Sequence, residues 1–355
     1  MATVKLGDIA IEAKSSNKGD KTGIRIVGLE HLTPSNVTLS SWSDDTENSF
    51  TKEFLKGDVL FGRRRAYLKK AAVAPFDGIC SGDITVIRAI EDKVDPDLLP
   101  FIIHNDFLFD FAVGKSAGSL SPRVKWTHLK EFTIDIPSMP EQSKLAETLW
   151  SINETKNAYE KLINKTDELV KSQFIEWFGN EKNTAELGEC AFIEKGKTIT
   201  RDNVVEGDIP VVAAGIEPSC YHSESNRSAG IITVSASGAN AGYVNYWNMP
   251  IFASDCNTIL TKDTNKLDEV FLFHRLRTIQ EEIFLMQRGS GQPHVYAKDL
   301  EHIIVPMPNM DAQIRFSAFA EESDKSKFAL QEAIKDLDAL SKKIIAENLI
   351  PVGKE

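Results

Sequence analysis

Two long stretches of the chain place apolar or amphipathic residues at steps of three and four, the spacing of one face of an α-helix. In the second stretch the steps of four and three alternate without a break, as in a coiled coil. The positions expected to form the buried stripe, and the interface of a helix pair, are Leu145, Leu149, Ile152, Tyr159, Ile163, Val170, Phe316, Leu330, Ile334, Leu337 and Ile344. The pattern predicts two helices of about 35 residues, each about 50 Å long.

Two arrangements of these helices fit the pattern. Either each helix packs on its own domain, or the two helices pack against each other. Helices of this length exceed the mean of about 11–12 residues, and a small globular domain offers them little surface. We therefore expect an antiparallel coiled coil with a globular domain at each end.

The segments before and between the helices carry short β-branched runs separated by turns. We expect strands at 84–89, 132–137, 209–214, 230–236 and 302–306, and helices at 99–112 and 270–284. Strand and helix do not alternate regularly, so a doubly wound parallel sheet is not expected. The predicted fold class is α+β, with two mixed α/β domains (1–140 and 179–308) alternating with two long helices (141–178 and 309–355).

The chain also repeats itself. Residues 118–142 align without a gap on residues 289–313, at an offset of 171, and eight of the 25 positions are identical. Weaker matches lie upstream, where Asp83 and Asp255 stand in related settings. The period is too long for a solenoid. The repeat indicates a duplicated module and an internal pseudo-two-fold relation.

Composition limits the classes of protein that remain. The chain has 355 residues, 42% of them hydrophobic, and a net charge of −11. That charge argues against DNA binding through bulk attraction, but residues 57–72 hold five basic side chains and one acid. The four cysteines lie far apart, with no C-x-x-C pair, so we expect no metal site and no disulfide framework. No signal peptide or membrane span is expected, which favours a cytoplasmic protein with no membrane partner.

The duplicated motif carries a family resemblance. Its first copy reads Gly118-Ser119, Pro122, Leu129, Ile136-Pro137 and Pro140-Glu141-Gln142. A motif of this form that closes each of two domains, followed each time by a long helix, resembles the specificity subunit of a type I restriction–modification system. The second copy departs from the pattern, with Asp311-Ala312-Gln313 in place of Pro-Glu-Gln and His294 in place of Arg123.

The resemblance implies a function and partners. Each domain would be a target-recognition domain that reads one half of a bipartite, asymmetric site in double-stranded DNA. The helices would set the spacing of the half-sites and bind two adenine-methyltransferase subunits, and restriction/translocase subunits would join the complex. S-adenosylmethionine, ATP and Mg²⁺ would act in the partner subunits, with no cofactor in this chain.

Candidate DNA contacts follow from residue type and position in the repeat. Arginine matches guanine edges and phosphates, whereas Asn and Gln suit adenine. The first domain offers Arg63, Arg64, Arg65, Tyr67, Lys69, Ser119, Arg123 and Lys125, and the second offers Ser235, Ser237, Asn240, Tyr243, Arg288, Gln292, His294 and Tyr296. If residues 63–65 continued a strand, Arg64 would point away from its two neighbours. A solvated surface loop or a salt-bridged strand is the alternative interpretation of the arginine run.

Catalytic motifs are missing from the sequence. No Asn/Asp-Pro-Pro-Tyr/Phe run, Walker A spacing, G-x-G-x-x-G or H-E-x-x-H is present, so no catalytic residue is assigned and a non-enzyme is expected. Two other hypotheses stay open. One is a recognition subunit whose single partner fuses methyltransferase and nuclease; the other is a coiled-coil adaptor that binds proteins in place of DNA.

Overall fold

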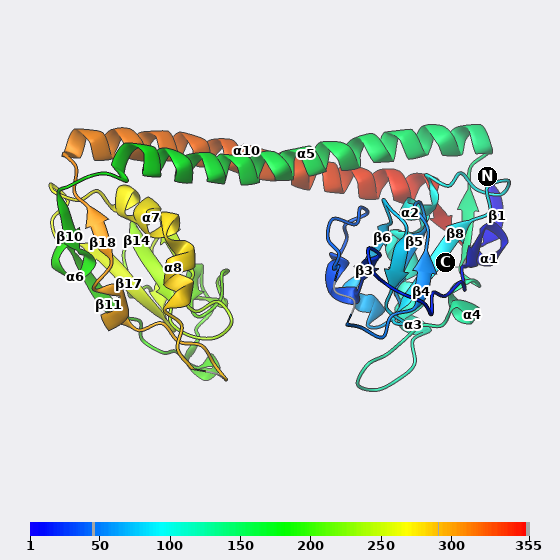
Figure 1. Ribbon diagram of the computed structural model, residues 1–355, viewed down its shortest axis with the longest axis horizontal. Coiled ribbons are helices and arrows are strands. Elements are labelled where there is room, and N and C mark those ends of the chain that lie inside the picture. Colours follow the sequence, from blue (N-terminus) through cyan, green and yellow to red (C-terminus); the bar gives the residue numbers. More distant parts are fainter. Residues whose placement is uncertain (45–46, 290, 353–355) are drawn as a thin grey trace. The chain divides into compact units, whose positions relative to one another are not determined.

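The structure is a computed structural model, and it describes residues 1–44, 47–289 and 291–352. The chain forms two compact units (Figure 1). Unit 1 combines Met1–Glu160 with Gln331–Glu355, and unit 2 is the continuous segment Lys161–Leu330. Each unit therefore contains part of both long helices, α5 (Met139–Phe178) and α10 (Met310–Asn348).

Unit 1 is a mixed α/β body. Its strands are β1 (Ala2–Lys5), β2 (Ala10–Glu12), β3 (Arg25–Val27), β4 (Lys52–Phe54), β5 (Val59–Gly62), β6 (Ala71–Val73), β7 (Gly78–Cys80), β8 (Ile84–Ala89), β9 (Thr133–Ile136) and β19 (Ile350–Pro351). Its shorter helices are α1 (Leu6–Ile9), α2 (Leu99–Ile103), α3 (Asp106–Gly114) and α4 (Trp126–Leu129), with 3₁₀ turns η1 (Leu29–His31) and η2 (Ala66–Leu68). The main sheet is antiparallel in the order β2-β8-β5-β6.

Unit 2 repeats that plan. Its strands are β10 (Thr184–Glu186), β11 (Ala191–Lys195), β12 (Ile209–Val212), β13 (Cys220–His222), β14 (Ile231–Ser235), β15 (Val244–Trp247), β16 (Phe252–Ala253), β17 (Cys256–Thr261) and β18 (Ile304–Pro306). Its helices are α6 (Leu187–Cys190), α7 (Glu269–Thr278), α8 (Gln280–Leu285) and α9 (Ala297–Leu300), with the 3₁₀ turn η3 (Arg201–Asn203). The main sheet, β11-β17-β14-β15, takes the same chain-order path as in unit 1. The smaller sheets differ, β3-β7-β4 in unit 1 and β13-β12-β16 in unit 2.

The predicted mixture of strand and helix is confirmed, with three differences in the helices. The long helix expected over 309–355 ends at Asn348, and Ile350–Pro351 form the strand β19. The segment expected as one helix at 99–112 is two, because α2 ends at Ile103 and Asn105 caps α3 by accepting a hydrogen bond from the Phe107 amide. The Asn105 amide also donates to the Leu349 carbonyl, 2.9 Å away. The helix expected at 270–284 likewise divides at Ile279 into α7 and α8.

The stripe predicted on α5 and α10 faces inward in each unit. All eleven predicted positions are buried or half-buried. At the end of α5, Trp177 is 39% exposed and the buried aromatic ring is that of Phe178. In unit 2, the ring of Phe316 on α10 lies 5.1 Å from that of Phe174 on α5, between ring centres. Val170, Phe174 and Phe316 join the core of unit 2, and Leu149 joins that of unit 1.

A buried glutamine joins the start of each long helix to its domain. In unit 1, Gln142 accepts a hydrogen bond from the Asp95 amide and donates to the Pro137 carbonyl, at 2.9 and 3.0 Å. In unit 2, Gln313 accepts from the Asp268 amide at 2.9 Å and donates to the Lys266 and Pro308 carbonyls at 2.9 and 2.8 Å. The last Gln of the repeated motif is therefore a structural clamp that satisfies buried backbone groups.

Candidate nucleic-acid interface

The arginine run of unit 1 lies where β5 ends and meets a hairpin. The Arg63 amide donates to the Asp83 carbonyl at 3.0 Å, and the Val124 amide donates to the Arg63 carbonyl at 3.0 Å. The Arg65 amide donates to the Pro122 carbonyl at 2.8 Å. These bonds form a stem that fixes residues 63–65 to the hairpin 117–123. The stem lies at the end of β5 opposite to the turn at Gly57.

Strand alternation does not decide where the three arginines point. The strand β5 ends at Gly62, and Arg65 adopts left-handed backbone at φ 55°. Arg65 is exposed, whereas Arg63 and Arg64 are half-buried. Among the described residues, nothing accepts a hydrogen bond from the buried Nε of Arg63.

Asp83 organises two of the cationic side chains. Arg123 donates to it in a forked arrangement, with Nε and Nη2 at 2.7 and 3.1 Å from the two carboxylate oxygens. Nη1 of Arg64 lies 3.6 Å from the same carboxylate, and Nε of Arg64 donates to the Ser121 hydroxyl at 2.7 Å. The hydrogen bonds from Arg123 hold the pKa of Asp83 below its usual range. Arg64 and Arg123 are thus held in one orientation, with 40% of each side chain still exposed.

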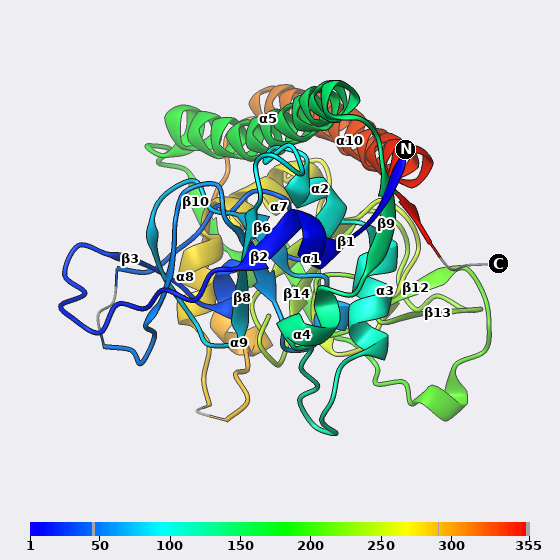
Figure 2. The same cartoon turned by 90° about the vertical axis from the view of Figure 1, so that its right-hand side faces the viewer.

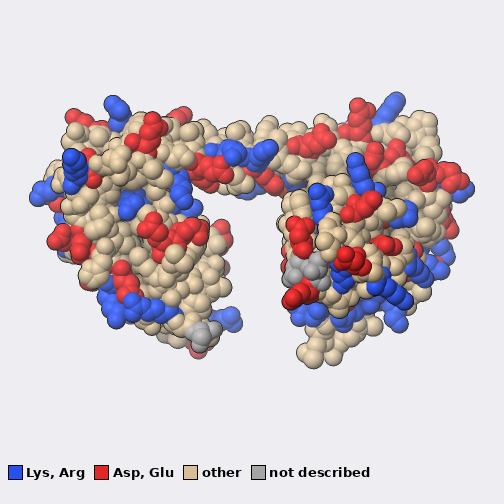
Figure 3. Space-filling view, in the orientation of Figure 1, with Lys and Arg blue, Asp and Glu red and all other residues tan. Residues whose placement is uncertain are grey.

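The other predicted residues of unit 1 are spread around this stem. Tyr67, Ser119 and Lys125 are exposed, and Ser119 belongs to the hairpin itself. Lys69 forms an ion pair with Asp106 at the start of α3. Figure 3 shows Lys and Arg side chains gathered at the end of unit 1 that carries the hairpin. In Figure 2 the hairpin projects beyond α3 and α4, on the side of the unit away from α5.

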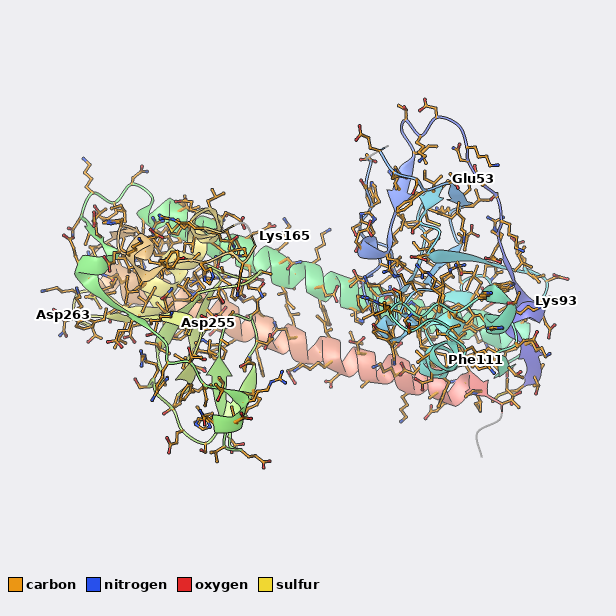
Figure 4. All side chains as sticks on the ribbon, turned by 90° about the horizontal axis from the view of Figure 1, so that it is seen from below. Glu53, Lys93, Phe111, Lys165, Asp255 and Asp263 are labelled. Carbon is orange, nitrogen blue, oxygen red and sulfur yellow. The ribbon has the colours of Figure 1, made fainter. Side chains whose placement is uncertain are left out.

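Unit 2 builds the same stem from different side chains. The Val295 amide donates to the Ala236 carbonyl and the Gly238 amide to the Pro293 carbonyl, at 3.0 and 2.9 Å. Arg288 pairs with His294 as Ala117 pairs with Arg123 in unit 1. Asp255, labelled in Figure 4, takes the place of Asp83, but it accepts from the Ser237 hydroxyl, whereas Asp83 accepts from Arg123 and forms an ion pair with Arg64.

Several predicted residues of unit 2 are directed inward. Ser235 and Ser237 are each 5% exposed, and both hydroxyls bond within the unit. Tyr243 lines a cavity of about 390 Å³ with Arg277 and residues of α5 and α10. Asn240 is half-buried at the start of this turn, where its carbonyl accepts from the Tyr243 amide. These positions support the loop, and we leave the two serines out of the proposed contact surface because their hydroxyls are already used.

The hairpin of unit 2 presents its remaining polar side chains at the surface. Gln292 is exposed, and the rings of His294 and Tyr296 stack with centres 6.0 Å apart. Arg288 donates to Asp299 at 2.8 Å while 61% of its side chain stays exposed. Ser290, one of the identical positions of the repeat, lies outside the described residues.

Asp83, Asp255 and Leu120 belong to these stems and hairpins, but the sequence did not single them out as candidate contacts. The repeat did mark Asp83 and Asp255 as related, which was the usable signal for their place in the stem. It gave no sign of Leu120, which stands at the tip of the unit 1 hairpin. No cluster of His, Cys, Asp or Glu suited to a metal ion occurs among the described residues. In the same part of the chain, no helix is long and apolar enough to span a membrane.

Two units whose main sheets follow the same strand order, each with a hydrogen-bonded stem of polar side chains and part of both long helices, define a duplicated protein of the α+β class. The comparison with known families identifies it further. The chain belongs to the family described as type I restriction modification DNA specificity domain, whose model matches residues 1–169 and again 180–337.

Individual relatives agree with this assignment. The chain is 27% identical to the type I restriction enzyme EcoDI specificity subunit of Escherichia coli over 145 residues, which cover 38% of this chain and 31% of that subunit. It is 21% identical to the putative type I restriction enzyme MjaX specificity subunit of Methanocaldococcus jannaschii, over 94% of this chain and 88% of that one. The crystal structure of a type I restriction–modification S subunit from M. genitalium matches with a TM-score of 0.62 at 14% identity, over 99% of this chain and 96% of that one, which shows a shared fold.

Proposed function

We propose that this chain is the DNA-specificity subunit of a type I restriction–modification complex. Unit 1 reads one half of a bipartite, asymmetric site in double-stranded DNA and unit 2 reads the other. The helices α5 and α10 pair as an antiparallel coiled coil that sets the spacing of the half-sites, under the pseudo-two-fold relation of the repeat. This is a DNA-recognition component in the cytoplasm, with no catalytic residue of its own.

The observation that carries the proposal is the pair of equivalent stems. Both units hold a loop and a hairpin together with matching backbone hydrogen bonds, Arg65 to Pro122 and Gly238 to Pro293. The side chains on the two stems differ in charge and in hydrogen-bonding groups. A constant scaffold with different polar side chains suits the reading of two different base sequences.

Partner subunits would supply the methyltransferase and restriction activities of the complex. Two adenine-methyltransferase subunits, with S-adenosylmethionine, would bind the helices and domains, and restriction/translocase subunits would use ATP and Mg²⁺. One solved structure with a TM-score of 0.55, at 20% identity over 98% of this chain and 97% of that one, concerns complex assembly and conformational transition of the type I system. Mixed charge on α5 and α10 suits a protein partner better than DNA.

The test is methylation mapping by single-molecule sequencing. The chain is expressed with its native methyltransferase partner in a host that lacks adenine methylation. We expect a bipartite, asymmetric motif with methylated adenine in both halves. Replacing residues 1–140 by the matching segment of another family member should change one half only. An assembled complex that methylates no motif would contradict the proposal.

A further inference from the structure

The hairpin of unit 1 ends in a fully exposed leucine. Leu120 is 89% exposed, the highest value among the large hydrophobic side chains that the structure describes. Single exposed apolar residues are common on protein surfaces, so exposure alone carries no function. The position of Leu120 within the site is what distinguishes it.

Backbone hydrogen bonds hold the two ends of the hairpin together, and arginine side chains lie beside them. Ala117 and Arg123 exchange two backbone hydrogen bonds of 3.0 and 2.9 Å, and Gly118 turns the chain at φ 113°. Arg64 bonds to Ser121, the residue next to Leu120. Figure 1 shows the loop extending from the end of unit 1 below α3 and α4. The exposed tip of the hairpin therefore lies next in sequence to a residue bound by Arg64, at the place where a duplex contacting Arg64 and Arg123 would be expected.

We propose that Leu120 is an apolar wedge that enters the base stack of the half-site bound by unit 1 and opens one base step. Apolar side chains presented beside basic residues kink DNA in this way, because the unstacking is offset by a longer contact surface. The inference rests on the proposed function, and it adds a shape-reading element to it.

The leucine at the hairpin tip has no counterpart at the matching position of unit 2, so only the half-site bound by unit 1 would meet it. At the offset of 171, Leu120 corresponds to Gly291 and Ser121 to Gln292. Unit 2 therefore presents no side chain at the equivalent tip position and a polar one beside it. The DNA distortion is consequently expected in the half-site of unit 1 and not in that of unit 2.

The experiment uses the complex with its methyltransferase partner and the motif mapped as above. End-labelled duplexes carrying that motif report bending by energy transfer, and titrations report affinity. We expect Leu120→Ala to reduce the bend, to weaken binding to the motif about tenfold, and to change binding to unrelated DNA less than about twofold. Leu120→Met, which keeps the apolar volume, should behave as the unchanged chain.

The matched control is Leu55→Ala. Leu55 is 47% exposed in the same unit and lies beyond the opposite end of β5, so it should alter neither bend nor affinity. An equal bend and affinity for Leu120→Ala and the unchanged complex would overturn the proposal. So would a loss of partner assembly in Leu120→Ala without DNA, because Leu120 would then dock a protein. A motif that is methylated normally without any bend refutes the wedge alone, whereas no methylated motif refutes the proposed function.

Discussion

Lys156 of α5 forms an ion pair with Asp338 of α10 in unit 1, and the residues 171 positions away form the reciprocal pair in unit 2. There Lys327 of α10 binds Asp167 of α5, so lysine and aspartate have exchanged helices. The two ion pairs are related by the 171-residue offset of the repeat, with the roles of the two helices exchanged. The positions that form ion pairs between the two helices are therefore part of the duplicated sequence.

Double-mutant cycles should detect both pairs. Burial lowers the pKa of Lys327, but hydrogen bonds with Asp167 and Asp324 raise it by more. We expect Lys327→Ala with Asp167→Ala to give a coupling free energy of about 1 kcal/mol, and Lys156→Ala with Asp338→Ala about 0.5–1 kcal/mol. The exposed pair of Lys165 and Glu168, 2.7 Å apart, is the control and should give about 0.3 kcal/mol. Urea unfolding supplies each value, and equal coupling at all three pairs would contradict the expectation.

Removing the Gln313 side chain should be the most costly polar change in unit 2. Gln313 is fully buried, and Gln313→Ala leaves the Asp268 amide and the Lys266 and Pro308 carbonyls without this partner. We expect a loss of about 3 kcal/mol in the free energy of unfolding. Gln142→Ala should cost about 2 kcal/mol in unit 1. The exposed Gln331→Ala is the control and should stay within about 0.5 kcal/mol.

Acid should destabilise unit 2 through His274. Burial lowers the pKa of His274 to about 4, and its Nε2 has no hydrogen-bond partner among the described residues. Asp324, Lys327, Arg277 and Asp167 are the charged groups that act on it. In the unfolded chain the pKa returns to about 6.5, so the unfolded state binds the proton first and stability falls as the pH drops from 7 toward 4. Below the folded pKa the loss levels off.

The size of this effect can be isolated with one variant. Between pH 7 and pH 5 the His274 contribution should fall by about 2 kcal/mol. Urea midpoints at both pH values should show that His274→Gln removes this part of the pH dependence. His128→Gln, at an exposed histidine of unit 1, should leave it in place. If both variants kept the same pH dependence, His274 would not be its source.

The salt dependence of DNA binding should separate Arg65 from Arg64. Arg65 is exposed, and among the described residues none accepts a hydrogen bond from its side chain. Arg65→Ala should therefore reduce the slope of log affinity against log salt by about 1, with the methylated motif unchanged. Arg64→Ala also removes the bond to Ser121, so it should relax sequence preference in the half-site of unit 1. The exposed Lys93→Ala, on the loop after β8 at the end of that strand away from Asp83 (Figure 4), should change neither.

Periodicity and the repeat predicted most of the framework. The stripe on α10, from Phe316 to Ile344, needed only the helical period, because both helices bury one face along their length. The correspondence between the two hairpins followed from the alignment of Gly118 with Gly289 at an offset of 171, but Arg65 corresponds to Gly238, at an offset of 173, which the alignment did not give.

The directions of individual side chains could not be predicted. Whether Ser237 meets solvent depends on Asp255, 18 residues away, which takes its hydroxyl. Arg123 is likewise held by Asp83, 40 residues earlier. These hydrogen bonds depend on where β5 and β14 end and on which loops meet there. Neither can be predicted from the types of the individual residues. Sequence therefore indicated the loops that carry the candidate contacts, and tertiary structure decides which of their side chains remain exposed.

The strand β19 has a consequence for how the chain is made. It pairs with β9 through Ile350 opposite Asp135, and β9 in turn pairs with β1 at the beginning of the chain. All residues of unit 2, a continuous segment, are available for folding once residue 330 has been synthesised. Unit 1 must wait for the last turns of α10 and for β19 before its sheet and core close. The unit whose synthesis begins first is therefore the one expected to finish folding last.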